Sequence, residues 1–486
     1  MFQPLPCPTL SFLMWYHQEK TEDIMKLLIQ NGTVVTCTDS FRGDVFLEDG
    51  LIHSVGANIR TQFPDAEVID ATGKLVLPGA IDGHTHIEMP LGETHSSDSY
   101  FTGTRAALFG GTTSIIDYAN QVIGESLNKT LNDWQIRAKD QAVCDYGFHM
   151  TISDPREDFL KEIPGLLDAG VSSFKCFFAY KGRLMISDEA FVRLMKLSRR
   201  YGFLVNLHAE NGDMVEEATN RLLSEGKKSP QFHALAHPRE AEVEAVERAI
   251  RLAEQTGGNL NLVHITCEES VQAIAEAKKR GVHLFAETCP QYLILADDRY
   301  DLPGFEAAKW VLSPPLRKIH DRNALWKGLA EGTLDTVGTD HCPFSFEKQK
   351  TLRKDRFDRI PNGAPGIEDR VEILYHFGVK QDRISLNQWV DRCCTAPAKR
   401  YGIYPSKGDI VPGSDGDIVI FDPEKTHTIS ARTRHMNVDY NTYEGISITG
   451  KVESVFLRGI PVIKSSQYLG CPGSGQYLTR TAPEGC

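Results

Sequence analysis

Residues 75–86, LVLPGAIDGHTH, form a short apolar segment that ends in polar residues. Strand-like segments of this kind recur along the chain and alternate with amphipathic helical segments. Their centres lie near residues 80, 115, 147, 174, 205, 263, 284 and 337. Eight such units over about 300 residues predict an α/β protein built on a (β/α)8 barrel.

Two of the connecting segments show the helical pattern well. In residues 237–258, HPREAEVEAVERAIRLAEQTGG, apolar residues recur at helical spacing and Gly257 is a suitable C-terminal stop. In residues 267–281, CEESVQAIAEAKKRG, acidic residues come first and basic residues last, which suits the helix dipole. Both segments therefore support helices between the strands.

The segments that flank the barrel have a different residue pattern. Short β-branched runs separated by Asn-Gly, Asp-Gly and Pro-Gly turns occur on both sides of it, so we expect the two ends of the chain to meet in one small β-sandwich domain. The expected division is an N-terminal extension at residues 1–24, a β domain from residues 25–75 and 408–465, a catalytic barrel at residues 76–407 and a tail at residues 466–486. The extension lacks the basic start and the cleavage site of a secretory signal. The tail is expected to be an arm across a subunit boundary or a disordered end.

The composition argues against several classes of protein. The 486 residues carry a formal net charge of -12, whereas nucleic-acid binders show basic patches, so no nucleic-acid partner is expected. No apolar run approaches the roughly 18 residues that a membrane helix needs, so no membrane partner is expected either. The 11 cysteines are odd in number and include no Cys-x-x-Cys pair, which fits reduced thiols in the cytoplasm.

The polar residues at the strand ends form a pattern of their own. In a (β/α)8 barrel, the catalytic residues lie at the C-terminal ends of the strands. The first strand ends in His84 and His86, which point to one face because strand residues alternate. Later strands end in His208, His264 and Asp340. One such histidine alone is usually structural, but the set indicates a metal site for zinc, with manganese, cobalt or iron as substitutes.

Lys175 lies on the fourth strand and has aromatic neighbours. A charged amine beside Phe174, Phe177 and Phe178 would be costly to bury. Its amine therefore reaches the barrel mouth, forms a salt bridge, or is neutral and has taken up carbon dioxide. The resulting carbamate is an anion that could bridge two cations. Four histidines and one aspartate would provide a two-metal site with no bridging ligand, and the carbamate would supply it.

Eight motifs in uninterrupted order resemble those of the cyclic amidases of the amidohydrolase superfamily. They are LVLPGAIDGHTH, SSFKCFFAYKG, NLHAEN, VHIT, AETCPQYL, LSPPLR, GTDHCPF and PNGAPGIEDR. The pattern is most similar to the hydantoinase/dihydropyrimidinase group and extends from about residue 25 to about residue 465. The resemblance implies a hydrolase that opens the cyclic amide of hydantoins or 5,6-dihydropyrimidines and releases N-carbamoyl amino acids.

The resemblance also implies a role for each matching position. The implied metal ligands are His84, His86 and Asp340 for the first ion, His208 and His264 for the second, and N6-carboxylated Lys175 as the bridge. Asp340 would also act as general base towards water and then as general acid towards the leaving nitrogen.

Three further positions match substrate-binding residues of the group. The hydroxyl of Tyr180 would polarise the scissile carbonyl, and backbone groups of Ser313 and Asn362 would hold the ring amide. From the residues alone, Tyr180 could equally be a wall residue, and Ser313 and Asn362 could be turn residues beside Pro and Gly.

The choice of ring follows from the residues after His86. Related dihydroorotases place an arginine there for the carboxylate of their substrate, whereas this chain has Glu88 and apolar residues, so an uncharged ring is expected. Met89, Leu91, Phe177 and the stretch around Leu184 are the candidates for ring selection.

Two other functions stay open at this point. One is hydrolysis of another cyclic ureide such as allantoin. The other is a non-catalytic dihydropyrimidinase-like scaffold, which is disfavoured because every ligand position is filled. Enzymes of the group are commonly homotetramers, so a homotetramer or a homodimer is expected.

Overall fold

The structure is a computed structural model that describes residues 25–484. The expected extension at residues 1–24 and the last two residues of the tail lie outside the described residues.

Eight parallel strands form the barrel, and each lies where the sequence predicts a strand. They are β6 (Ala80–Thr85), β9 (Thr112–Asn120), β10 (Asp145–Thr151), β11 (Ser173–Phe177), β12 (Leu204–His208), β13 (Asn259–Leu262), β14 (Leu284–Thr288) and β15 (Thr336–Val337). Each pairs with the next in chain order, from β6 to β15. The predicted (β/α)8 fold is confirmed.

The first and last strands are joined mainly by side-chain and loop contacts. The backbone N–H of His86 donates to the carbonyl of His341 at 2.8 Å. The fully buried guanidinium of Arg370 donates to the carbonyls of Ile81 at 2.9 Å and Val337 at 2.8 Å. Arg370 therefore connects β6 with β15, where the last strand is only two residues long.

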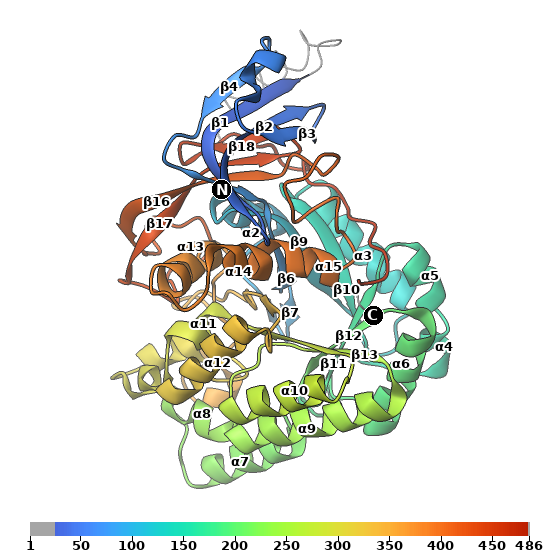
Figure 1. Ribbon diagram of the computed structural model, residues 1–486. Coiled ribbons are helices and arrows are strands. Elements are labelled where there is room, and N and C mark those ends of the chain that lie inside the picture. The colour runs from blue at the N-terminus through green and yellow to red at the C-terminus, as the bar shows by residue number, and fades with distance from the viewer. Residues whose placement is uncertain (1–24, 485–486) are drawn as a thin grey trace.

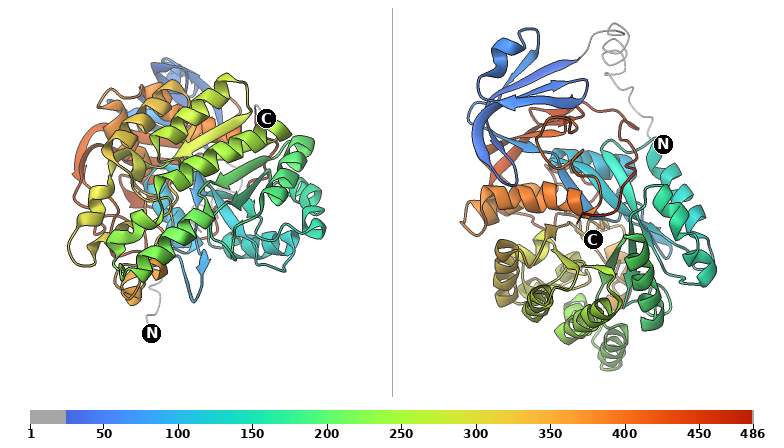
Figure 2. Two further views of the ribbon diagram at one scale, coloured as in Figure 1. Left: turned by 90° about the horizontal axis from the view of Figure 1, so that it is seen from below. Right: turned by 45° about the vertical axis from the view of Figure 1, so that its right-hand side comes forward.

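Helices surround the barrel, as the view from below shows (Figure 2). The longer ones are α2 (Tyr100–Phe109), α3 (Leu127–Lys139), α6 (Asp188–Tyr201), α7 (Gly212–Ser224), α9 (Arg239–Thr256), α10 (Glu268–Lys279) and α12 (Ile319–Glu331). The shorter ones are α4 (Glu157–Leu160), α5 (Ile163–Asp168), α8 (His233–Ala236), α11 (Pro290–Ile294), α13 (Arg370–Leu374), α14 (Leu386–Val390) and α15 (Ala396–Arg400). As predicted, α9 stops at Gly257, whose φ of 67° is left-handed. Among residues 25–484, no helix has the length and apolar character needed to cross a bilayer.

The two ends of the chain join in one nine-stranded sheet above the barrel (Figure 1). Its N-terminal strands are β1 (Lys26–Val35), β2 (Ser40–Glu48), β3 (Leu51–Gly56), β4 (Glu67–Asp70) and β5 (Leu75–Pro78). Its C-terminal strands are β16 (Ile418–Thr428), β17 (Ser447–Leu457), β18 (Ile460–Lys464) and β19 (Gln467–Tyr468). The antiparallel pairing of β5 with β16 links the two sets, as the sequence predicts. A small hairpin of β7 (Pro90–Leu91) and β8 (Thr94–His95) follows the first barrel strand.

The described part of the tail packs against its own barrel. The N–H of Leu478 donates to the carbonyl of Tyr146 at 2.7 Å. The buried guanidinium of Arg480 donates to the hydroxyl of Ser173 at 2.8 Å. Both contacts lie near the starts of β10 and β11, at the end of the barrel away from the polar strand ends. The described part of the tail therefore packs on its own chain. The acceptors that Arg480 reaches inside the barrel could not be inferred from the short polar sequence of the tail.

Candidate metal centre

His84, His86 and Asp340 come together at the mouth of the barrel. Asp340 Oδ1 lies 3.2 Å from His84 Nε2 and 3.1 Å from His86 Nε2. The ligand atoms of the three residues all lie within 4.8 Å of one another. His84 Nε2 is buried and forms no hydrogen bond within the described residues. Two imidazole nitrogens and a carboxylate that converge in this way fit a divalent cation such as zinc.

His208 and His264 form a second group beside the first. His208 Nδ1 and His264 Nε2 are 2.9 Å apart, and the rings of His264 and His84 have centroids 5.4 Å apart. His208 Nε2 lies 2.8 Å from Glu210 Oε2, so it donates there and leaves the Nδ1 lone pair facing His264. Two imidazole nitrogens that face each other fit a shared cation.

Lys175 is buried near both of these groups. Only 1% of its surface is exposed, and its Nζ lies 4.9 Å from the ring centroid of Phe177. Burial lowers the pKa of Lys175 to about 8, and its charge in turn helps to lower the pKa of His86, His208 and His264. The described residues provide no ion-pair partner for it. Lys175 thus forms no salt bridge within the described residues, and its lowered pKa makes the neutral amine, the form that reacts with carbon dioxide, more accessible than in a solvent-exposed lysine.

The charge balance of the site favours a cation. Burial lowers the pKa of His86 to about 4 and that of His264 well below its usual value, so both imidazoles are neutral, as metal binding requires. Burial also opposes a charge on His84, but the carboxylates of Asp340 and Glu287 outweigh it and raise the pKa of His84 to about 9. The same negative charge that holds a proton on His84 would attract a metal ion in its place.

Three of the expected site residues have left-handed backbone conformations. The φ angle is 64° at Tyr180, 42° at His264 and 53° at Asp340. For residues other than glycine this conformation is uncommon and costs about 1–3 kcal/mol where the packing enforces it. The surrounding structure thus holds these residues at the strand ends against local preference, which is frequent at functional sites.

Two carboxylates that sequence reasoning missed orient the metal-facing histidines. Glu287 Oε1 lies 2.6 Å from His84 Nδ1, and Glu210 Oε2 faces His208 in the same way. Both carboxylates are fully buried. A carboxylate on one imidazole nitrogen fixes the tautomer and leaves the other nitrogen free to bind metal. The signal was present, because both glutamates belong to the strand-end motifs HAEN and AETCPQYL.

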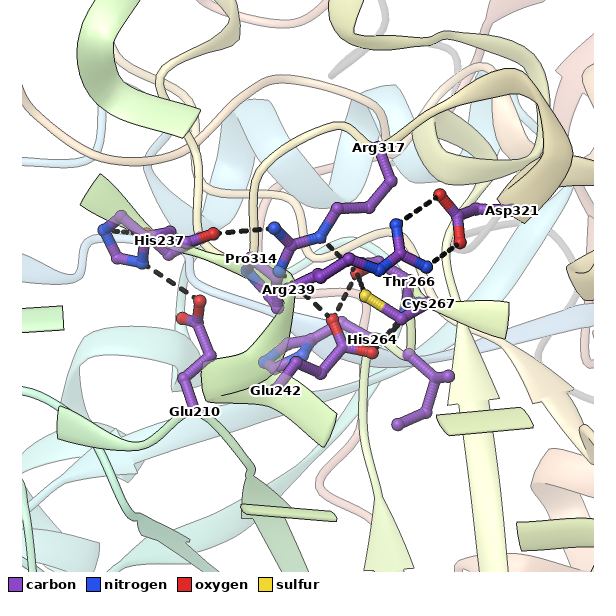
Figure 3. A network of polar contacts seen from close by, with 12 residues as sticks. Glu210, His237, Arg239, Glu242, His264, Thr266, Cys267, Pro314, Arg317 and Asp321 are labelled. Carbon is purple, nitrogen blue, oxygen red and sulfur yellow. Dashed lines mark hydrogen bonds and ion pairs between the residues drawn. The ribbon is translucent and has the colours of Figure 1, made fainter. Parts of the chain in front are cut away.

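Glu210 also begins a polar network that reaches the loop after residue 312 (Figure 3). Its second oxygen, Oε1, lies 3.0 Å from His237 Nδ1. The carbonyl of His237 accepts from Arg317 Nη1 at 2.6 Å, and Arg317 Nε donates to the Thr266 hydroxyl at 3.0 Å. Glu242 accepts from the N–H of Thr266 at 3.0 Å. The network therefore fixes the segment that carries His264 relative to the loop that carries Ser313.

Replacing Glu210 with glutamine is expected to weaken metal binding by the His208 and His264 pair by about 10–100-fold, because the neutral amide no longer fixes the His208 tautomer. Chelator competition with zinc measures this affinity. Glu217→Gln, an exposed change on α7, is the matched control. Unchanged affinity for both ions in the Glu210 variant would refute the role of this carboxylate.

The expected substrate residues gather next to the His208 group. Asn362 Nδ2 donates to the Ser313 hydroxyl at 2.7 Å. The rings of Tyr180 and His208 have centroids 5.2 Å apart. Burial raises the pKa of Tyr180 above its usual value, so its hydroxyl stays protonated and can donate. Asn362 Oδ1 is buried without a partner among the described residues, which leaves an acceptor for a ligand.

Two of the four candidates for ring selection, Phe177 and Leu184, contact residues of this group. The ring of Phe177 lies beside that of His208, with centroids 5.5 Å apart. The N–H of Leu184 donates to the carbonyl of Tyr180 at 3.0 Å. Leu91 belongs to the β7–β8 hairpin and Met89 immediately precedes it.

Comparison with known proteins places this architecture in a class. The family model described as "Amidohydrolase family" matches residues 75–462. A D-hydantoinase from Geobacillus stearothermophilus is 47% identical over 457 residues, which is 94% of this chain and 97% of that protein. A D-hydantoinase from Streptomyces coelicolor is 45% identical over 461 residues, 94% of this chain and 98% of that protein. The crystal structure of a dihydropyrimidinase from Brevibacillus agri is similar with a TM-score of 0.93 and 47% identity, over 94% of this chain and 99% of that chain.

The chain therefore belongs to the amidohydrolase family of hydrolases. Within this family its nearly full-length relatives place it in the hydantoinase/dihydropyrimidinase group, which confirms the resemblance of the eight sequence motifs.

Proposed function

We propose that this protein hydrolyses the cyclic amide bond of hydantoins or 5,6-dihydropyrimidines and releases N-carbamoyl amino acids. The observation that carries the proposal is the convergence of Asp340, two pairs of histidines and the hydroxyl of Tyr180 at one end of the barrel. The names of the relatives, D-hydantoinase and dihydropyrimidinase, support the same substrate class.

The site would hold two divalent ions, for which we propose zinc, with manganese or cobalt as substitutes. The proposed ligands are His84, His86 and Asp340 for one ion, His208 and His264 for the other, and Lys175 as an N6-carboxylysine bridge. When bound, such a pair of ions lowers the pKa of water and polarises a carbonyl oxygen. The burial of Lys175 and the absence of an ion pair to it among the described residues support the carbamate.

Asp340 would move the proton. Burial alone would raise the pKa of Asp340, but His84 and His86 outweigh burial and hold the pKa well below its usual value. Its carboxylate is therefore ionised at neutral pH and can accept a proton from water. The protonated acid would then deliver this proton to the ring nitrogen as the C–N bond breaks, because an amide nitrogen is a poor leaving group unless it is protonated.

Ser313 and Asn362 would hold the ring, and Tyr180 would act on the carbonyl. The hydroxyl of Tyr180 remains protonated because burial raises its pKa, so it can donate to the oxygen on which negative charge develops.

Tyr180→Phe is expected to lower kcat by about 10²–10³-fold with a smaller change in KM, because the lost donor acts mainly on the developing oxyanion. Steady-state ring opening of hydantoin measures both constants. Tyr201→Phe, at the end of α6, removes a tyrosine hydroxyl outside the site and is expected to leave both unchanged. A kcat within twofold of the wild-type value in Tyr180→Phe would exclude this role.

The residues after His86 support a neutral ring. Glu88 accepts from the N–H of Tyr100 at 3.2 Å and would repel a substrate carboxylate rather than pair with it. The test is a comparison of kcat/KM for hydantoin, 5-substituted hydantoins, dihydrouracil, dihydroorotate and allantoin. Turnover of hydantoins or dihydrouracil above the other two supports the proposal, whereas a preference for dihydroorotate or allantoin refutes it.

We also propose a cytoplasmic homotetramer in which residues 76–407 form the catalytic barrel and residues 25–75 with 408–465 form the β domain. The cysteine pattern supports the location, and the common assembly of the group supports the tetramer. The joined terminal strands support the division into domains.

A further inference from the structure

Lys350 is a buried lysine that the proposed reaction does not use. Three lysines are buried among residues 25–484, namely Lys175, Lys350 and Lys407. Lys407 has three carboxylates at 2.7–2.8 Å, and Lys175 lies among the metal-facing histidines. Lys350 is 0% exposed and forms no ion pair within the described part of the chain. An unpaired amine this deeply buried calls for a specific set of acceptors.

The acceptors of Lys350 are carbonyls of two different loops. Its Nζ donates to the carbonyl of Val311 at 3.1 Å and to the carbonyl of Pro361 at 3.0 Å. The N–H of Gly363 donates to the same Val311 carbonyl at 3.0 Å, which brings the two loops into direct contact. The amine therefore lies at the junction of the loops and satisfies a carbonyl from each.

These two loops carry the substrate residues. Val311 is two residues before Ser313, and Pro361 immediately precedes Asn362. The side chains of Ser313 and Asn362 meet at 2.7 Å. Neither residue lies in a helix or a strand, so no regular backbone hydrogen bonds fix their separation. The distance between the two ring-binding residues thus depends on contacts between the loops.

We propose that Lys350 is a positioning residue that clamps these two loops together and so sets the spacing of Ser313 and Asn362 for a cyclic amide. The inference rests on the proposed function for the identity of the ligand, but the clamp itself rests on the contacts of Lys350.

The chemistry of the amine suits such a clamp. Burial lowers the pKa of Lys350 to about 7. An ammonium has three N–H donors and a neutral amine keeps two, so Lys350 can donate a hydrogen bond to both carbonyls in either protonation state. A methionine has a similar length and shape without a donor, so it removes the clamp and retains most of the packing.

The test compares metal-replete Lys350→Met with the wild type and with Lys348→Met, a control at an exposed lysine two residues earlier. Hydantoin is the kinetic probe, with dihydrouracil as the second. Because ring binding is shared by ground state and transition state, KM is expected to rise about tenfold while kcat stays within about threefold. Hydrogen exchange of residues 311–316 and 360–366 is expected to quicken in Lys350→Met and not in Lys348→Met.

The outcomes separate the clamp from the proposed function. An unchanged KM in Lys350→Met would overturn the clamp. A fall in kcat that is accompanied by loss of the bound metal ions would also overturn it. If Lys350→Met does not fold, Lys350→Gln replaces it. The glutamine side chain is one bond shorter than that of lysine, so its amide is expected not to reach both carbonyls. A KM equal to the wild-type value in this variant would overturn the proposal. If the wild type opens neither ring, the proposed function fails, and hydrogen exchange of the two loops alone decides the clamp.

Discussion

Replacing Lys175 with alanine is expected to abolish the two-metal site and to lower kcat/KM for ring opening by about 10⁴-fold or more. The reason is that Lys175 is buried near both groups of histidines and, under the proposed function, would supply as a carbamate the anion shared by both ions. Metal analysis of the purified variant is expected to find at most one ion per chain.

Lys181→Ala is the matched control for this variant, because Lys181 is an exposed lysine whose amine pairs with Asp213 and Glu216. It is expected to retain both ions and full turnover. Added short-chain carboxylate is expected to restore part of the activity of Lys175→Ala by placing an anion in the vacated space. Retention of both ions with full turnover in Lys175→Ala would refute the bridging carbamate.

Asp340→Asn is expected to lower kcat by about 10³-fold, within the range for loss of a positioned acid–base group. Asparagine keeps the size of the side chain and an oxygen beside His84 and His86, but it cannot accept and return a proton at neutral pH. Steady-state kinetics of hydantoin ring opening checks the result. Asp213→Asn, at an exposed carboxylate, serves as the control. A kcat within tenfold of the wild-type value would show that another group carries the proton.

The fold could be predicted closely from the sequence because its signals are local. Strand and helix periods alternate eight times, and Gly257 ends α9 in a conformation that glycine readily adopts. His84 and His86 were identified from their spacing on one strand, and Lys175 was singled out because a charged amine among phenylalanines would be costly to bury. These inferences need only residues that are near one another in the chain.

The remaining features depend on contacts between distant segments. The link that Arg370 makes between β6 and β15 joins residues far apart in sequence, and so does the network from Glu210 through His237 to Arg317. The burial of Lys350 likewise depends on loops that are distant from it in sequence, those that carry Val311 and Pro361. Tyr180, Ser313 and Asn362 were found only through the family resemblance, because single hydroxyl and amide residues carry no distinctive spacing.

Ring opening of hydantoin is the decisive measurement, with enzyme that has been prepared with bicarbonate and shown to bind two divalent ions per chain. The expected result is N-carbamoylglycine as the product, a kcat of roughly 1–10³ s⁻¹, and loss of turnover when the ions are removed. Two bound ions per chain without ring opening of hydantoin, 5-substituted hydantoins or dihydrouracil would contradict it.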